Sequence, residues 1–220
     1  MELPPLTLNQ LSTVAASNLP PSQLYEVLSR YEIEAALLAS VSTNAGSGGE
    51  HNELLSVFYS SFFFAHLLTN QLSEARALTQ RVPDALRNSD TSTQNCLTLL
   101  RALWQTQHGQ VYQILREIPW PQAIRPLIRR FDGFFQDETL IAVSKSYEAI
   151  RPDVAASYLG LDPQALESGE SSVISKFTSC GWKWDSTAKL LFPSPIVVQT
   201  EAQHSTNAFF DTMALLGKRD

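Results

Sequence analysis

The side chains best suited to metal binding are few and widely separated in this 220-residue chain. The four histidines are His51, His66, His108 and His204. A zinc site needs three or four His, Cys, Asp or Glu ligands, usually in closely spaced groups, and none of these histidines has a cysteine or carboxylate at such a spacing. His66 lies in an apolar run, where a hydrogen-bonded core histidine is the expected role, and His108 precedes a glycine at a predicted turn. The sequence therefore predicts no metal site.

Motifs for nucleophilic catalysis and phosphate binding are also missing. The glycine-rich stretch "NAGSGG" at 44–49 has no following Gly-Lys-Ser/Thr, so it does not form a P-loop, and neither a nucleophile elbow nor a dinucleotide fingerprint occurs. Cys180 is expected on an apolar helix side rather than in the electropositive setting of a reactive thiol. Cys96 and Cys180 are far apart, and reduced, buried thiols are favoured over a disulfide. We expect no enzyme, no cofactor and no small-molecule substrate.

Helical periodicity dominates the elements that would position any site. The stretch 20–41 puts Leu24, Leu28, Tyr31 and Ala35 on one stripe, with Ser22 as a candidate N-cap. The run "LLSVFYSSFFFAHLL" at 54–68 is apolar on nearly all sides, as in a helix packed against several neighbours. It is too short to span a membrane. The N-terminus carries no basic patch followed by an apolar run, so we expect no secretory signal and a location in the nucleus and cytoplasm.

A two-copy repeat of a helix pair follows. When Pro83 is aligned with Pro119, Ala75, Leu78 and Val82 fall on Val111, Ile114 and Ile118, a spacing of 36 residues that is close to the tetratricopeptide period. A further helix is predicted over 136–150, with Leu140, Val143, Tyr147 and Ile150 on one face, and Arg151-Pro152 should end it. The pattern predicts helix pairs stacked into an array.

The order of elements after residue 152 predicts a winged helix with a small β-sheet. Asp153 can cap a short helix that ends at Gly160, and Asp162-Pro163 can start the next helix. The stretch "ESSVISKFTSCG" predicts a helix that ends at Gly181. One side of it carries Val173, Ile174, Phe177 and Cys180. "WKW" and "KLLF" are the two wing strands, joined through "DSTA". The predicted segments are N-terminal helices (1–43), a flexible linker or loop (44–50), a helical-repeat array (51–152), the winged helix (153–195), and a linker with a C-terminal helix (196–220).

The charge distribution argues against the binding of nucleic acid. The chain has a formal net charge of -6, and the segment 151–195 holds four basic and five acidic residues. A helix that reads a DNA groove needs Arg or Lys for phosphates and Arg, Asn or Gln for base edges. The candidate helix offers Lys176 alone and starts with Glu170. The basic cluster of Arg125, Arg129 and Arg130 lies outside the module and fits a solvated or partner-facing helix side. A DNA-binding regulator remains the alternative of another class.

Binding to protein is the function that this composition favours. A two-stranded sheet has a free edge, which can pair with a neighbour's strand through backbone hydrogen bonds. Trp182, Trp184, Leu190 and Phe192 are bulky for so small a sheet. We expect the two on the inner face to cover the winged-helix core and the other two to be free for a partner. Phe209 and Phe210 either dock on their own domain or join helices of other chains.

A helical array, a winged helix and a tail helix, in this order, resemble the PCI-domain family. The pattern is carried by "LSEARALTQRVP", by the spacing from "LWQTQHGQVYQIL" to "IPWPQAI", by "SKSYEAI" before "VAASYLGL", and above all by "GWKWDSTAKLLFP". The similarity covers about Glu53 to Pro195. The stretch "DPQALESGESS" is longer than the family pattern and suggests an inserted loop, and residues up to Gly49 carry no recognisable family pattern.

The resemblance implies a mainly α fold and a non-catalytic scaffold that binds other PCI-domain subunits of one complex. It is closest to the family's members in the COP nine signalosome, which removes the ubiquitin-like modifier Nedd from cullins; the proteasome lid and translation initiation factor three are the alternatives. The signalosome's catalytic subunit uses a His-x-His zinc motif, which does not occur here. By resemblance, the sheet edge would contact neighbouring subunits and the tail helix would enter a helical bundle. The residues implied are Trp182, Trp184, Leu190, Leu191 and Phe192 for the edge, and Phe209, Phe210, Met213 and Leu216 for the bundle.

Overall fold

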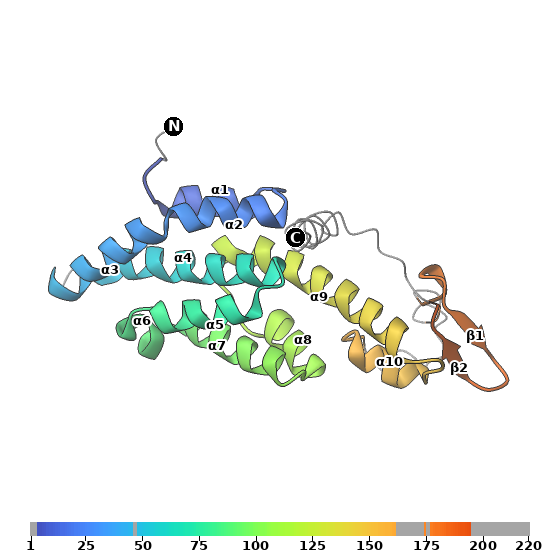
Figure 1. Cartoon of the computed structure of the whole chain (residues 1–220). Helices are drawn as coiled ribbons and strands as arrows, with labels where there is room; N and C mark the ends of the chain where they lie inside the picture. The colour runs from blue at the N-terminus through green and yellow to red at the C-terminus, as the bar shows by residue number, and fades with distance from the viewer. Residues whose placement is uncertain (1–3, 46–47, 162–173, 175–176, 195–220) are drawn as a thin grey trace, which may run out of the picture.

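The fold is mainly helical and ends in a two-stranded antiparallel sheet (Figure 1). The computed structural model describes residues 4–45, 48–161, 174 and 177–194, and the predicted tail helix with Phe209, Phe210, Met213 and Leu216 lies outside them. The labelled elements are α1 (Leu8–Ala16), α2 (Pro21–Arg30), α3 (Glu32–Ala45), α4 (Gly48–Leu68), α5 (Leu72–Arg81), α6 (Asp84–Ser89), α7 (Thr91–Trp104), α8 (His108–Glu117), η1 (Gln122–Ile124), α9 (Arg125–Ser146), α10 (Pro152–Tyr158), β1 (Lys183–Asp185) and β2 (Leu190–Phe192).

The predicted N-terminal stripe is confirmed, although the helix boundaries differ from the prediction. Leu24, Leu28 and Ala35 are completely buried, and Tyr31 is almost so. The chain breaks into α2 and α3 at Tyr31, and α2 begins at Pro21, because proline suits the first helical position. Ser22 is therefore not the N-cap.

The glycine-rich linker predicted over 44–50 is wrong in extent. Helix α3 runs to Ala45 and α4 begins at Gly48, so both helices enter this stretch. Glycine costs a helix about 1 kcal/mol per residue relative to alanine but does not forbid it. The long buried helix that follows outweighs this cost.

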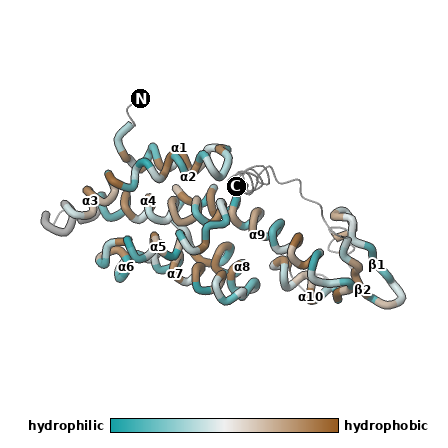
Figure 2. Tube along the Cα trace, viewed as in Figure 1, coloured by the Kyte–Doolittle hydropathy of each residue, from teal (hydrophilic) through white to brown (hydrophobic). Residues whose placement is uncertain are grey.

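Helix α4 is the centre of the array. It lies between the layer of α1 and α2 and the layer of α5, α6 and α7, and apolar residues recur along it (Figures 1 and 2). The Phe64 ring lies 5.5 Å from the ring of Trp120 and 5.8 Å from that of Phe131, both measured between centroids. Since nearly every residue of 55–68 is buried, the predicted all-round burial of this segment is confirmed.

The 36-residue repeat is confirmed in the backbone as well as in the apolar pattern. Helices α5 and α8 start at residues 72 and 108 and end at residues 81 and 117. Asn70 and Thr106, again 36 apart, both have positive φ (60° and 53°). The N–H groups of Gln71 and Gln107 donate to the carbonyls of His66 and Ala102, at 2.9 Å each. These bonds form the same Schellman-type C-cap after α4 and after α7.

One long helix, α9, joins the array to the winged helix. Its first half packs in the main core with Leu127 and Phe131, and Val143 in its second half belongs to a separate smaller core. The predicted extension to Ile150 is wrong, because α9 ends at Ser146 and Ile150 pairs with Leu191 instead. Ile150 is β-branched and directly precedes the Arg151-Pro152 pair, which favours extended backbone. Its bridge to Leu191 provides partners for its backbone N–H and C=O.

The described part of the winged helix agrees with most of the prediction. Gly160 and Gly181 both have positive φ (60° and 87°), as expected of helix terminators. Residues 174 and 177–179 are helical, and β1 pairs antiparallel with β2. Helix α10 begins at Pro152, so Asp153 lies in its first turn and is not the N-cap. Val173, Asp162-Pro163 and the suggested inserted loop fall outside the described residues.

The two thiols differ in environment. Cys96 is buried in the array, and burial raises its pKa to about 12, so it remains a thiol at neutral pH. Cys180 is exposed, contrary to the expectation of an apolar helix side, because the helix ends at residue 179 and Cys180 lies in the turn. Both cysteines are free.

Candidate partner interface

The wing sheet has one edge covered and one edge open among the described residues. Ile150 donates to the carbonyl of Leu191 at 2.8 Å, and Leu191 donates to the carbonyl of Ile150 at 2.9 Å. Strand β2 therefore lies between Ile150 and β1, and one side of the predicted free edge is closed within the chain. The open edge is the outer side of β1.

The backbone of Trp184 points toward this open edge. In an antiparallel ladder the backbone groups of successive residues face alternate sides. Both polar groups of Leu191 face Ile150, so the Trp184–Leu191 pair across β1 and β2 is a non-hydrogen-bonded pair. The N–H and C=O of Trp184 consequently face away from β2. They provide one donor and one acceptor for an added strand.

Two of the five predicted edge residues belong to the core instead. Leu191 is completely buried and Trp182 is 2% exposed. The Trp182 ring stacks on Phe177 at 4.9 Å, and its Nε1–H donates to Ser144 Oγ at 3.0 Å. The prediction that Trp182 and Leu191 lie at the partner surface is therefore corrected. Contact of these two side chains with another chain would require the small core to open.

The other three predicted edge residues remain accessible in different degrees. Trp184, opposite Leu191, packs partly against the small core. Leu190 and Phe192 lie on the opposite face, where Phe192 is 38% exposed. Their cross-strand partners are Asp185 and Lys183. We call this surface the wing edge; it consists of Lys183, Trp184, Asp185, Leu190 and Phe192.

Side chains of the array fix the position of the winged helix. Arg116 forms a bidentate pair with Asp132, with N–O distances of 3.0 and 2.9 Å, and its Nη1 donates to the carbonyl of Gly160 at 2.6 Å. Gln136 Nε2 donates to the carbonyl of Leu159 at 2.8 Å. These bonds hold the end of α10 against α8 and α9, so the wing edge has a defined direction relative to the array.

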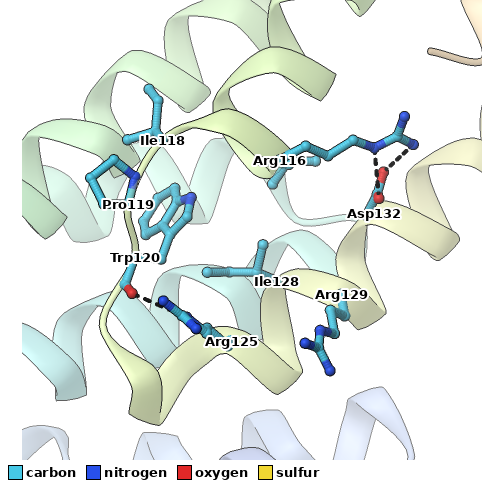
Figure 3. A pocket seen from close by; sticks show the side chains of 9 residues that line it. Arg116, Ile118, Pro119, Trp120, Arg125, Ile128, Arg129 and Asp132 are labelled. Atoms are coloured by element: carbon cyan, nitrogen blue, oxygen red, sulfur yellow. Dashed lines mark hydrogen bonds and ion pairs between the residues drawn. The ribbon is translucent and has the colours of Figure 1, made fainter. Parts of the chain in front are cut away.

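The arginine cluster of α9 flanks a groove of about 340 Å³ beside Trp120 (Figure 3). Arg125 Nε donates to the Trp120 carbonyl at 3.4 Å, and Arg129 is exposed. At the other end of the groove the Arg116 guanidinium is neutralised by Asp132, as Figure 3 shows. A carboxylate within the groove weakens its attraction for a phosphate backbone, and the cluster lies outside the wing.

The histidines of the array have packing roles. His66 is 2% exposed and lies 4.5 Å from the Phe62 ring, and its Nδ1 is 3.2 Å from Gln71 Oε1. Its Nε2 is buried and has no hydrogen-bond partner among the residues that the structure describes, so the predicted core position is right but only one nitrogen is paired there. Burial lowers the pKa of His66, which favours the neutral imidazole. His108 begins α8 and stacks on Phe135 at 5.7 Å.

The described residues contain no group of three or more His, Cys, Asp or Glu side chains that could hold a metal ion. Within the same part of the chain, no helix combines the length and apolarity that a membrane span requires.

Sequence reasoning missed Ile150 as the residue that covers β2. The available signal was the Arg151-Pro152 pair directly after it, because helical backbone is disfavoured at the residue before a proline. The helical spacing from Leu140 to Ile150 concealed this signal.

Comparison with known proteins agrees with the arrangement of array and wing. The CSN8/PSMD8/EIF3K family matches residues 53–202. COP9 signalosome complex subunit 8 of Emericella nidulans is 46% identical over all 220 residues and 99% of its own length, which includes the N-terminal helices that carried no recognisable pattern. The protein of the same name from Dictyostelium discoideum is 27% identical over 67% of this chain and 71% of its own, and that of Xenopus tropicalis is 24% identical over 61% and 66%. The chain belongs to the CSN8/PSMD8/EIF3K family.

Proposed function

We propose that this chain is a non-catalytic scaffold subunit of a COP9 signalosome, and that it supports removal of the ubiquitin-like modifier Nedd from cullin-RING ligases by holding other subunits in place. The observation that carries the proposal is the 46% identity over the full chain to a protein named COP9 signalosome complex subunit 8. The family also contains proteasome and initiation-factor branches by name, and full-length identity favours the signalosome branch over them.

The wing edge is the proposed contact with a neighbouring PCI subunit. Strand addition would use the outward N–H and C=O of Trp184, because backbone hydrogen bonds give affinity at an open sheet edge. Phe192 and Leu190 would add apolar contact on the outer face. The charged pair of Lys183 and Asp185 would set the register of the added strand and reduce unspecific pairing.

Co-expression with the other signalosome subunits of the same organism tests the assignment. We expect the chain to co-purify with them and to elute as part of one complex. Recovery with only proteasome-lid or initiation-factor subunits, or with none, would contradict the proposal.

A pair of variants tests the wing edge itself. Trp184→Ala and Trp184→Pro both remove the indole, but only Trp184→Pro removes the outward N–H, and proline is tolerated at a strand edge that faces solvent. We expect Trp184→Pro to bind its neighbour about tenfold more weakly than Trp184→Ala, a difference of about 1.4 kcal/mol. Circular dichroism should show both variants folded, and equal affinities would exclude pairing through this strand.

A further inference from the structure

A second groove is lined by residues of α5 and α7. These two helices lie away from the wing strands (Figure 1). Its volume is about 440 Å³. Trp104 at the end of α7 is 55% exposed, and the Arg76 guanidinium lies 5.3 Å from the centroid of its ring. Tryptophan and arginine are both enriched among the residues that dominate the binding energy of protein interfaces. The lining residues are Arg76, Leu97, Leu100, Arg101, Trp104 and Gln105.

The cations of this groove have no anionic partner among the described residues. Arg76 has its contact with the Trp104 ring, and no hydrogen bond or ion pair joins the side chain of Arg76 or Arg101 to the described part of the chain. Both arginines are exposed, in a chain whose formal net charge is -6. The groove therefore offers donors and positive charge beside an apolar ring.

The internal repeat contains an equivalent groove that is already filled. Helix α5 is followed by the short α6 and then α7, just as α8 is followed by the short η1 and then α9. Arg76 and Tyr112 occupy equivalent positions, 36 residues apart. The groove between α8 and α9 takes the end of α10, where Gly160 lies so close to Tyr112 that an added Cβ would be 2.3 Å from the ring.

The filled groove is closed by side-chain donors to backbone carbonyls at a helix end. By the repeat its donors correspond to Gln80 and Leu100, so the open groove would use Arg76 and Arg101 from other positions. Arg116 of α8 and Gln136 of α9 donate to the carbonyls of Gly160 and Leu159, the residues that follow the last turn of α10. Leu159 is the C-cap residue of α10, and Gly160 follows it. Carbonyls at a helix end that lack internal partners carry partial negative charge and accept hydrogen bonds from such side chains. Helix α10 thus presents its C-terminal end to two helices of the array.

We propose that the open groove between α5 and α7 receives the C-terminal end of a helix from another signalosome subunit, as the groove between α8 and α9 receives α10. Arg76 and Arg101 would donate to the last carbonyls of that helix or to an acidic side chain in its final turn, and Trp104 would cover an apolar residue there. This inference rests on the proposed function. It adds a partner surface away from the wing edge and specifies the element that binds there.

A photo-crosslinker at the groove rim tests this proposal in the reconstituted complex. Gln105 is exposed and lines the groove, so p-benzoylphenylalanine at position 105 leaves Arg76, Arg101 and Trp104 intact. We expect irradiation to join position 105 to the last turn of a helix in one other subunit, as mapped by mass spectrometry. A complex that forms normally without this cross-link overturns the groove proposal and leaves the scaffold function standing, whereas failure of the complex to form with the unsubstituted chain overturns both.

A charge-reversal variant measures the contribution of the arginines. Arg101→Glu should weaken binding of the cross-linked subunit about tenfold or more, because a desolvated arginine is replaced by a repelling carboxylate. Arg129→Glu, an equal change of charge at an exposed position on α9, should alter binding by less than about twofold. Equal effects of both variants on subunit binding would overturn the proposal. It would also be overturned if Arg101→Glu lost binding to a single-stranded oligonucleotide and kept binding to the subunit. Both positions are exposed, so circular dichroism is expected to show both variants folded.

Discussion

The array and the winged helix build their cores in opposite ways. The array packs helices that are mostly neighbours in sequence around α4. Its core includes several buried aromatic rings, such as those of Phe58, Phe62 and Phe64. The core of the winged helix is small and takes one or two residues from each of several distant segments, from Val143 in α9 to Leu191 in β2. Since buried apolar area is the main source of stability, most of the stabilising burial lies in the array. The wing, with its small core, depends on α9 and on the junction at Gly160.

This difference explains where partner surfaces can form. A small core leaves backbone and apolar side chains accessible, as at Trp184 and Phe192 of the wing edge. In the array, one accessible apolar surface lies at Trp104 between α5 and α7. A scaffold built this way has a well-packed centre and accessible surfaces, the wing edge and the groove at Trp104 among them, that another chain could complete.

The largest expected effect comes from removing one buried ring from each core. Phe64→Ala should lower the free energy of unfolding by about 3–5 kcal/mol, because it leaves a cavity beside Trp120 and Phe131. Phe177→Ala removes an equally buried ring from the wing. We expect hydrogen exchange to rise throughout the chain in Phe64→Ala, but only in residues 150–192 in Phe177→Ala. A uniform rise in both variants would show that the two cores unfold as one unit.

A smaller effect is expected at the junction between the two regions. Gly160→Ala should cost about 2–4 kcal/mol, because alanine is strained at φ 60° and its Cβ would overlap the Tyr112 ring. Gly181→Ala is the matched control, since Gly181 also has positive φ but nothing lies within 4 Å of an added Cβ. This control should cost only about 1–2 kcal/mol. Urea unfolding of both variants measures the difference, and equal losses would mean that Tyr112 does not lock α10 to the array.

The smallest effect concerns His66, the buried histidine of the array. Burial lowers the pKa of His66 in the folded chain below its ordinary value of 6.5, so on acidification the unfolded chain binds a proton that the folded chain excludes. Stability should therefore fall as the pH drops below about 6.5, with a slope of at most about 1.4 kcal/mol per pH unit from this group.

The substitution His66→Gln removes this contribution to the pH dependence. We expect a flatter dependence of the urea midpoint between about pH 7.5 and 5.5 in His66→Gln. The control His51→Gln, at an exposed position, should keep the dependence of the unmodified chain. If the slopes of all three proteins agree, His66 does not titrate differently in the folded and unfolded chains.

Local sequence patterns predicted the elements that are built from local contacts. The stripe from Leu24 to Ala35, the all-round apolar run of α4 and the 36-residue repeat depend on spacing along one helix, and the structure confirms each of them. The terminators Gly160 and Gly181 were also predictable, because a left-handed residue after a helix strongly favours glycine. The helices that start at Pro21 and Pro152 begin two residues earlier than the predicted caps Ser22 and Asp153 imply, since proline and polar caps compete for the same turn.

The candidate interface was predictable only as a region. The sequence indicated which strand pair carries the large side chains, but the face of each residue depends on register, and a shift of one residue reverses every side chain. The structure buries Trp182 and Leu191 and leaves Phe192 accessible because Ile150 fixes that register from outside the strand pair. Similarly, Trp104 is exposed because no other element covers it among the described residues. The sequence of α7 alone does not indicate whether such an element exists.

By itself the sequence determined the helical class, the period of the repeat, the order of array and wing, and the low positive charge of the wing. Tertiary structure alone decided that Ile150 leaves the helix to close one sheet edge and that the groove between α8 and α9 is filled by α10. It also decided that, within the described part of the chain, the outer edge of β1 and the groove between α5 and α7 stay open. The physical reason is range. Helical periodicity and caps act within a few residues. Coverage of an edge or a groove depends on which segment, distant in sequence, packs against it in the folded chain.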